Sequence, residues 1–247
     1  MTGVADAGFG TSHLLLLLQS GEIVSSGEDD FGQCSRLGTH FDSVHALSGV
    51  RAAGRPGVRD AAKVVAGVRH SAVLSREGVV TLVGEDRHQM PRVWRPEDAA
   101  VVDVGCGLRH AVALDSLGRV WTWGSNRHAS LGRRVPGDAD GPGLVEGLPS
   151  GVRWVGVECG WSHSVVKGVA PDGSAVFLGW GRSDMGQLPA VIDDSSDNTL
   201  LRRLLPLPEG GLTDVWMAGE STFAADEHGF LWGTGWNDHG GHYSKRY

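Results

Sequence analysis

Four histidines recur at matched positions and are the first residues whose spacing suggests chemistry. His13, His70, His110 and His163 each stand three residues after a glycine. Imidazole is a common zinc ligand, but a structural zinc site gathers its ligands into one tetrahedron. These histidines come one from each repeat, so we do not expect them to converge on a metal ion. We interpret each as a buried side chain hydrogen-bonded to neighbouring backbone. A weak metal site at a second group near the C-terminus is the alternative: His228, His239 and His242.

Other segments that resemble cofactor-binding or catalytic motifs lack the residues or the structural context that those motifs require. Gly105 and Gly107 begin a sequence like a dinucleotide fingerprint, but His110 replaces the third glycine and no helix is expected to follow. No phosphate-binding G-K-[ST] loop and no G-x-S-x-G nucleophile elbow occurs. Glu28–Asp30 and Asp193–Asp194 are paired acids in what we interpret as solvated loops. The sequence therefore predicts no catalytic residue and no cofactor.

Charge and cysteine content narrow the class of partner and the compartment. The net charge is −7 and no basic tail is present, which makes nucleic acid an unlikely main partner. Cys34, Cys106 and Cys159 are widely spaced, as in a packed domain in a reducing compartment. Leu14–Leu18 is far shorter than the ~20 apolar residues that cross a bilayer. We expect a cytoplasmic or nuclear protein with no membrane span.

A repeat of fixed spacing is the strongest feature of the chain. From a first glycine, the steps to a histidine and two further glycines are three, eight and six residues in three units. The fourth unit lengthens the last two steps, and the fifth has Thr222 at the predicted histidine position. The five sets are Gly10, His13, Gly21, Gly27; Gly67, His70, Gly78, Gly84; Gly107, His110, Gly118, Gly124; Gly160, His163, Gly173, Gly181; and Gly219, Thr222, Gly229, Gly235.

The third unit shows what each repeat builds. Val101–Val104 and Ala111–Leu114 are apolar strands, the second apolar on both faces, as in a sheet packed between other sheets. Asp115–Gly118 is a turn, and Arg119–Trp123 is a returning strand rich in β-forming residues. The first glycines of successive units stand 40 to 59 residues apart, which suits one four-stranded blade each. The predicted fold is an all-β propeller.

The repeat pattern, with its Val-x-Cys-Gly-x-x-His strand and Trp-Gly-Ser-Asn turn, resembles the regulator-of-chromosome-condensation repeat over roughly residues 7–240. Within that family three segments resemble the secretion-regulating guanine nucleotide exchange factor: residues 105–113, 124–137 and 235–240. The last, Gly-Trp-Asn-Asp-His-Gly, is also similar to a closing-blade motif of the fungal alpha-tubulin-suppressor protein. The resemblance implies a propeller that binds proteins.

The family norm implied by this resemblance is a ring of seven blades, whereas five units are visible here. We expect one domain over residues 1–247 with units at about 7–57, 58–98, 99–148, 149–210 and 211–241. The ring is then either shortened or closed differently. An open ring exposes strand edges. Homodimerisation or instability follows as a hypothesis, which a monomer with a cooperative melt would contradict.

Loops are where a propeller carries function, because the sheets only position them. The turns after the returning strands combine Arg, His, Asp and aromatic residues, the types that anchor protein interfaces. Trp161, between two strands of one unit, either is exposed as a binding residue or packs on the next blade. The candidate partner-binding residues are Asp29, Asp30, Phe31, Arg87, Asn126, Arg127, His128, Trp161, Arg182, Asp184, Trp236, Asp238 and His239.

The expected function is a non-catalytic scaffold for protein partners. The resemblance implies three partner classes: a small GTPase, a tethering-complex subunit, or the zinc protein of diphthamide synthesis and Elongator-dependent tRNA modification. Guanine nucleotide exchange is the alternative activity. It requires only that the GTPase be shifted toward a conformation that releases its nucleotide, so no bond is made or broken and no catalytic residue is needed. A chromatin-binding role is the third, and the acidic charge opposes it.

Overall fold

The computed structural model describes residues 3–34, 45–46, 60–84, 93–188, 190–191, 202–204 and 211–236. Within these ranges the regular structure is β-sheet, apart from one short 3₁₀ helix, Arg127–Ala129. The strands form five antiparallel sheets, one for each repeat, so the all-β fold predicted from the spacing is confirmed. We number these sheets blades 1 to 5 in chain order.

Each blade is a meander that starts with an inner strand. Blade 1 contains β1 (Val4–Phe9), β2 (His13–Leu18), β3 (Ile23–Gly27) and β4 (His45–Ala46); blade 2 contains β5 (Ala61–Ala66), β6 (His70–Ser75), β7 (Val80–Gly84) and β8 (Val93–Trp94); blade 3 contains β9 (Val101–Cys106), β10 (His110–Asp115), β11 (Val120–Gly124) and β12 (Ala139–Leu144).

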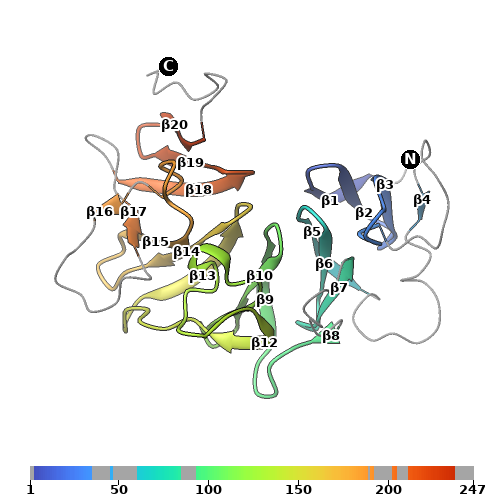
Figure 1. Cartoon of the computed structure of the whole chain (residues 1–247), viewed down its shortest axis with the longest axis horizontal. Coiled ribbons are helices and arrows are strands. Elements are labelled where there is room, and N and C mark those ends of the chain that lie inside the picture. Colours follow the sequence, from blue (N-terminus) through green and yellow to red (C-terminus); the bar gives the residue numbers. More distant parts are fainter. Residues whose placement is uncertain are drawn as a thin grey trace.

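The last two blades depart from four strands. Blade 4 is β13 (Arg153–Cys159), β14 (His163–Val169), β15 (Ala175–Gly181), β17 (Arg202–Leu204) and β16 (Ala190–Val191), with the last two in reversed order. Blade 5 has three strands among the described residues, β18 (Leu212–Ala218), β19 (Ser221–Asp226) and β20 (Leu231–Gly235). The blades follow one another around a common centre lined by β1, β5, β9, β13 and β18, and an opening separates blade 1 from blade 5 (Figure 1).

The hydrophobic core lies between blades. Leu15, Leu17 and Ile23 of blade 1 pack on Ala61, Val64 and Val73 of blade 2. The same arrangement recurs between blades 2 and 3, 3 and 4, and 4 and 5. In blades 2 and 3 the second strand thus buries both faces, one against the preceding blade and one against the next, which explains its largely apolar sequence.

The recurring glycine after the returning strand is fixed by backbone geometry. Gly124 has a φ of +98°, and a Cβ there would overlap the carbonyl oxygen of Arg109. The register pairs Gly124 with His110, and the equivalent glycine pairs with the equivalent residue in every blade. Only glycine meets both requirements.

The same register corrects one sequence prediction. Gly235 pairs with Ser221, so Ser221 and not Thr222 occupies the histidine position of blade 5. Spacing from Gly219 was misleading because Ala218, one residue earlier, is the structural equivalent of Gly107. Thr222 instead matches Ser71 and Ser164, the residues that follow the histidines in blades 2 and 4.

Candidate partner-binding face and central channel

Three of the four recurring histidines form a hydrogen bond with a hydroxyl of the next blade. His13 Nε2 lies 2.7 Å from Ser71 Oγ, His110 Nε2 lies 2.8 Å from Ser164 Oγ, and His163 Nε2 lies 3.0 Å from Thr222 Oγ1. The predicted burial is confirmed, but the partner is a side-chain hydroxyl rather than backbone. Between blades 2 and 3 the matching position is Ala111, which offers no hydroxyl.

Two of these contacts continue into a loop and fix the histidine tautomer. Ser71 Oγ donates to the Gln33 carbonyl at 3.0 Å, and Thr222 Oγ1 donates to the Gln187 carbonyl at 2.6 Å. A hydroxyl has one proton, so the imidazole Nε2 must be the donor to it. We call this His–Ser/Thr–Gln chain the histidine relay.

The relay requires neutral imidazole. Burial lowers the pKa of His13 and His163 to about 4 and that of His110 to about 3. Nδ1 of His13 and of His163 has no hydrogen-bond partner within the described chain, so a second proton would be buried without an acceptor.

In three of the four units with a histidine, the glycine three residues before it makes room for the ring, whereas a Cβ on Gly67 would overlap the carbonyl oxygen of Gly107 in the next blade. A Cβ on Gly107 or Gly160 would overlap Cε1 of His110 or His163. Blade 5 has Ser221 in place of the histidine and Ala218 in place of the glycine. The Gly-x-x-His spacing is therefore a packing rule, not a ligand motif.

The candidate loop residues that the structure describes lie on one face of the propeller. In blades 1, 3, 4 and 5 the loop after the third strand begins against the turn between the first two strands of the same blade. Ser125 N donates to Arg109 O at 2.7 Å, Arg182 N to Ser162 O at 2.9 Å and Trp236 N to Glu220 O at 3.0 Å. We call this side the loop face. Arg87, Asp238 and His239 lie outside the described residues.

Several loop-face candidates hold their own loops. Asp29 Oδ1 accepts from Cys34 N at 2.6 Å, and Asn126 Oδ1 accepts from Leu131 N at 3.3 Å. The guanidinium of Arg69 lies 4.4 Å from the centre of the Phe31 ring.

A polar network joins the loops of blades 4 and 5. Arg182 pairs with Asp184 at 2.7 Å and reaches Glu220 at 3.5 Å. Glu220 also accepts from Ser162 Oγ and Gln187 Nε2, each at 3.0 Å. The hydrogen bond from Arg182 lowers the pKa of Asp184. Glu220 was not predicted from sequence, because its partners come from a different blade.

A second set of loop-face side chains is left to solvent. Asp30, Arg127, His128, Asp184 and Trp236 are exposed. Met185, which the sequence did not single out, is exposed beside them in the blade 4 loop. They supply one guanidinium, two carboxylates, an imidazole and apolar surface on one face.

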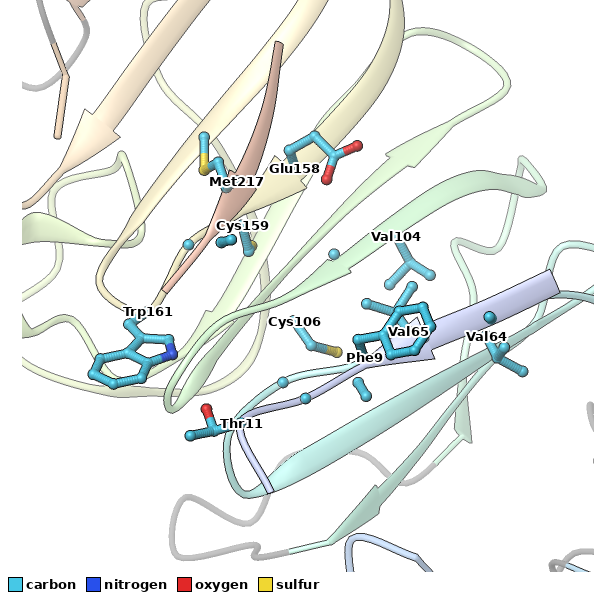
Figure 2. Close-up of a pocket in the computed structure, with 18 of the residues that line it drawn as sticks. Phe9, Thr11, Val64, Val65, Val104, Cys106, Glu158, Cys159, Trp161 and Met217 are labelled. Atoms are coloured by element: carbon cyan, nitrogen blue, oxygen red, sulfur yellow. The ribbon is translucent and has the colours of Figure 1, made fainter. Parts of the chain in front are cut away.

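Trp161 stands where the loop face meets a central cavity of about 610 Å³ (Figure 2). Its backbone N–H donates to Gly219 O of blade 5 at 2.8 Å, and its indole lies against Gly219. The ring is nevertheless only half-buried. Both sequence alternatives hold in part: Trp161 packs on the next blade and lines the cavity mouth.

The cavity wall changes character along its depth. Phe9 and Val65 lie together in one part of the apolar wall, Met217 lies beside Cys159 in another, and Thr11 is the labelled side chain beside Trp161 (Figure 2). Burial raises the pKa of Cys159 to about 12, so that thiol in the wall stays protonated.

Deeper in the channel lies a charged belt: Asp6, Lys63, Asp103, Glu158, Lys167 and Asp214. Lys63 pairs with Asp103 at 2.6 Å, and Lys167 pairs with Asp214 at 2.9 Å and Glu158 at 3.3 Å. Each lysine joins neighbouring blades, since Lys63 and Asp103 belong to blades 2 and 3 while Lys167 and Asp214 belong to blades 4 and 5.

The described residues contain no group of three His, Cys, Asp or Glu side chains placed to hold a metal ion. His239 and His242, two members of the alternative metal site, lie outside the described ranges. No helix in the described part is long and apolar enough to cross a membrane.

Comparison with known proteins identifies the repeat. Residues 118–166 and 101–129 match models of the "Regulator of chromosome condensation (RCC1) repeat". The ultraviolet-B receptor UVR8 of Arabidopsis thaliana is 28% identical over 244 residues, which cover 94% of this chain and 53% of UVR8. The probable E3 ubiquitin-protein ligase HERC4 of Homo sapiens is 29% identical over 98% of this chain and 23% of its own length.

Solved structures agree on the fold. Human WBSCR16 superposes with a TM-score of 0.74 at 21% identity, over 96% of this chain and 62% of that one. Prp20p of Saccharomyces cerevisiae gives a TM-score of 0.71 at 20% identity, over 94% and 57%. Residues 101–166 of this chain match the RCC1 repeat, and the chain has the β-propeller fold of these structures. It spans about half the length of UVR8 and less than a quarter of HERC4.

Proposed function

We propose that this propeller is a non-catalytic protein-interaction scaffold whose partner binds the loop face around Trp161. One observation carries the proposal: the loops of blades 3, 4 and 5 present Arg127, His128, Asp184, Met185 and Trp236 to solvent on a single face. Exposed Arg, aromatic and Met side chains are enriched at protein interfaces. The rigid sheets beneath them would hold such a surface without ordering cost on binding.

The partner classes come from the subfamily resemblance of residues 105–113, 124–137 and 235–240. They are a small GTPase, a tethering-complex subunit, and the zinc protein of diphthamide synthesis and Elongator-dependent tRNA modification. The structure of Prp20p was reported with its binding properties to Gsp1p and histones, which supports keeping a small GTPase first among them. Guanine nucleotide exchange is the second proposed function on that ground. Cys34, Cys106 and Cys159 form no disulfide with one another, which supports a cytoplasmic or nuclear location.

The test uses two matched variants and purified candidate partners. Replacing Trp161 with Ala and Arg127 with Glu alters the loop face, whereas Leu117→Ala alters an exposed apolar residue in the β10–β11 turn on the opposite side. We expect the loop-face variant to weaken binding in calorimetry at least about tenfold, and the control to leave it unchanged. A partner that binds the loop-face variant as well as wild type refutes the assigned surface.

Nucleotide release separates the two functions. A scaffold leaves the release of labelled GDP from a bound GTPase unchanged, whereas an exchange factor accelerates it. Acceleration that disappears in the loop-face variant would establish exchange at this face. Binding without acceleration would leave the scaffold function alone.

A further inference from the structure

Blade 1 exposes a sheet face that every other blade buries. In blades 2 to 5 the face toward the preceding blade includes Ala61, Val101, Trp154 and Leu212, which are 3%, 3%, 7% and 9% exposed. The equivalent residue of blade 1 is Val4, which is 53% exposed. Leu14, Leu16 and Leu18 extend the same face and are only half-buried.

Blade 5 exposes the opposite face in the same way. In blades 1 to 4 the face toward the next blade includes Ile23, Val80, Val120 and Phe177, which are 5%, 0%, 1% and 5% exposed. The residue in their register in blade 5 is Leu231, which is 60% exposed. Trp216 lies on the same side and is 36% exposed. The two ends of the arc thus present the two halves of a blade-to-blade contact, and both look toward the opening (Figure 1).

The two faces also match in hydrogen bonding. Asp6 of blade 1 accepts from Val64 N of blade 2 at 2.9 Å, and Asp103 of blade 3 accepts from Val157 N of blade 4 at 2.9 Å. Asp214 holds the same strand position in blade 5. Ala7 of blade 1 holds the register of Val64 and Val157. Blade 5 therefore carries the acceptor, and blade 1 the donor, of the contact that joins alternate blades.

The histidine relay does not extend to these ends. Blade 5 has Ser221 where a histidine would reach forward, and blade 1 has Leu14 where a hydroxyl would receive it. A contact between the two faces would be apolar, with the aspartate bond at its channel side. The absence of the histidine in blade 5 and of the hydroxyl in blade 1 both favour contact between these two faces, since a buried histidine opposite Leu14 would lack an acceptor.

We propose that a second copy of this chain covers these faces, with blade 1 of one copy packed on blade 5 of the other. The contact continues the four internal blade junctions in the same register and places Asp214 of one copy at the backbone N–H of Ala7 in the other. It is heterologous, because the two surfaces that meet are different. Each copy therefore keeps one unused face, and association grows with concentration unless the assembly closes.

The experiment uses this asymmetry. Leu16→Glu places a charge on the blade 1 face, Leu231→Glu places one on the blade 5 face, and Leu117→Glu is the control at an exposed turn. Light scattering after size exclusion should show wild type and the control at twice the monomer mass or more at high concentration. Each face variant alone should stay monomeric. An equimolar mixture of the two face variants should recover one intact junction and form a heterodimer.

Asp214→Asn tests the hydrogen bond without disturbing apolar packing. We expect the dissociation constant of the dimer to rise about tenfold, the effect of losing one charge-assisted bond. Thermal melts of all variants check that each one folds. The proposal is overturned by a wild-type protein that stays monomeric at every concentration, whether its own residues or another protein cover the faces. It is also overturned by folded variants whose mixture fails to associate, since that result indicates contact between identical faces.

Discussion

The junction between blades 4 and 5 and the junction between blades 2 and 3 share a register but not a chemistry. At the first, His163 reaches Thr222 and then Gln187, and Glu220 gathers three polar partners. At the second, Ala111 replaces the hydroxyl. Apolar side chains of both blades, including Leu74, Val80, Val101 and Trp123, fill that junction instead.

Aromatic contacts add to the apolar junction. The Trp94 ring, at the end of blade 2, lies 5.4 Å from both Trp121 and Trp123 of blade 3, measured between ring centroids. Such pairs contribute about 0.5–1.5 kcal/mol beyond area burial. The repeat thus fixes where blades meet, while each junction is stabilised by its own residues. A polar junction should respond more strongly to pH than an apolar one.

Acid should have the largest effect, at the junctions where a buried histidine bonds to a hydroxyl of the next blade. An unfolded histidine has a pKa near 6.5, whereas His110 and His163 have folded values of about 3 and about 4. Because the folded values are depressed, their contribution is complete above pH 6.5 and is lost as pH falls toward 4. Each costs about 2 kcal/mol between pH 7 and pH 5, before most carboxylates titrate. Denaturant unfolding at both pH values measures the loss, which we expect to reach about 4 kcal/mol for these two residues.

A variant with His163→Ser isolates one residue. Its loss of stability between pH 7 and pH 5 should be smaller than that of wild type by about 2 kcal/mol. Equal losses in the two proteins would mean that His163 is not the group that titrates.

The next largest effect should come from adding a side chain at the repeat glycine of blade 4, where blade 5 already has an alanine. Gly160→Ala places a Cβ against the His163 ring, and such overpacking costs about 3 kcal/mol. Adding His163→Ser should recover part of that loss, because blade 5 already contains the pair Ala218 and Ser221. Urea unfolding of both variants checks the order. A double variant less stable than Gly160→Ala alone would show that the ring does not limit the glycine position.

The apolar junction should tolerate loss of its ion pair. Lys63→Met leaves Asp103 with two backbone N–H donors, Val104 at 2.9 Å and Val157 at 2.9 Å. Lys63 is half-buried, so we expect a cost of about 1 kcal/mol at low salt, and less at high salt. Lys167→Met is the matched variant at the polar junction. A loss that salt leaves unchanged would assign the effect of Lys63 to packing of its stem.

The sequence predicted the elements better than their contacts. Gly-x-x-His spacing located four blades because the glycine and the histidine are only three residues apart, and in three of these blades the ring packs directly on the glycine, which is a local constraint. It misplaced the histidine position of the fifth blade, because Ala218 replaces the glycine and Ser221 replaces the histidine there. A search for the Gly-x-x-His spacing cannot detect a unit that lacks both residues.

The loop face was predictable in outline, since loops follow strands, but Glu220 was not. Its partners Ser162, Arg182 and Gln187 are 58, 38 and 33 residues away. A signal for the charged belt does exist. Asp6, Lys63, Asp103 and Gly156 each stand four residues before the repeat glycine, so that column could have been found by aligning the units.

The smallest expected change in stability concerns the loop of blade 3, which has an alanine where the loops of blades 1 and 4 have a glycine. Ala129 has a φ of +58°, where the same loop position in blades 1 and 4 is Gly32 at +73° and Gly186 at +79°. Holding a non-glycine residue in the left-handed region costs about 1–2 kcal/mol of stability. Glycine removes this strain, but it raises the entropy of the unfolded chain, which offsets part of the stability gained. Ala129→Gly should therefore stabilise the protein by about 0.5–1 kcal/mol, seen as a higher denaturant midpoint at unchanged slope. Ala99→Gly, at a half-exposed bend without positive φ, should instead destabilise it by a similar amount. If both changes destabilise the protein alike, the loop of blade 3 does not hold Ala129 in the left-handed region. That loop would then not share the backbone conformation of the loops in blades 1 and 4.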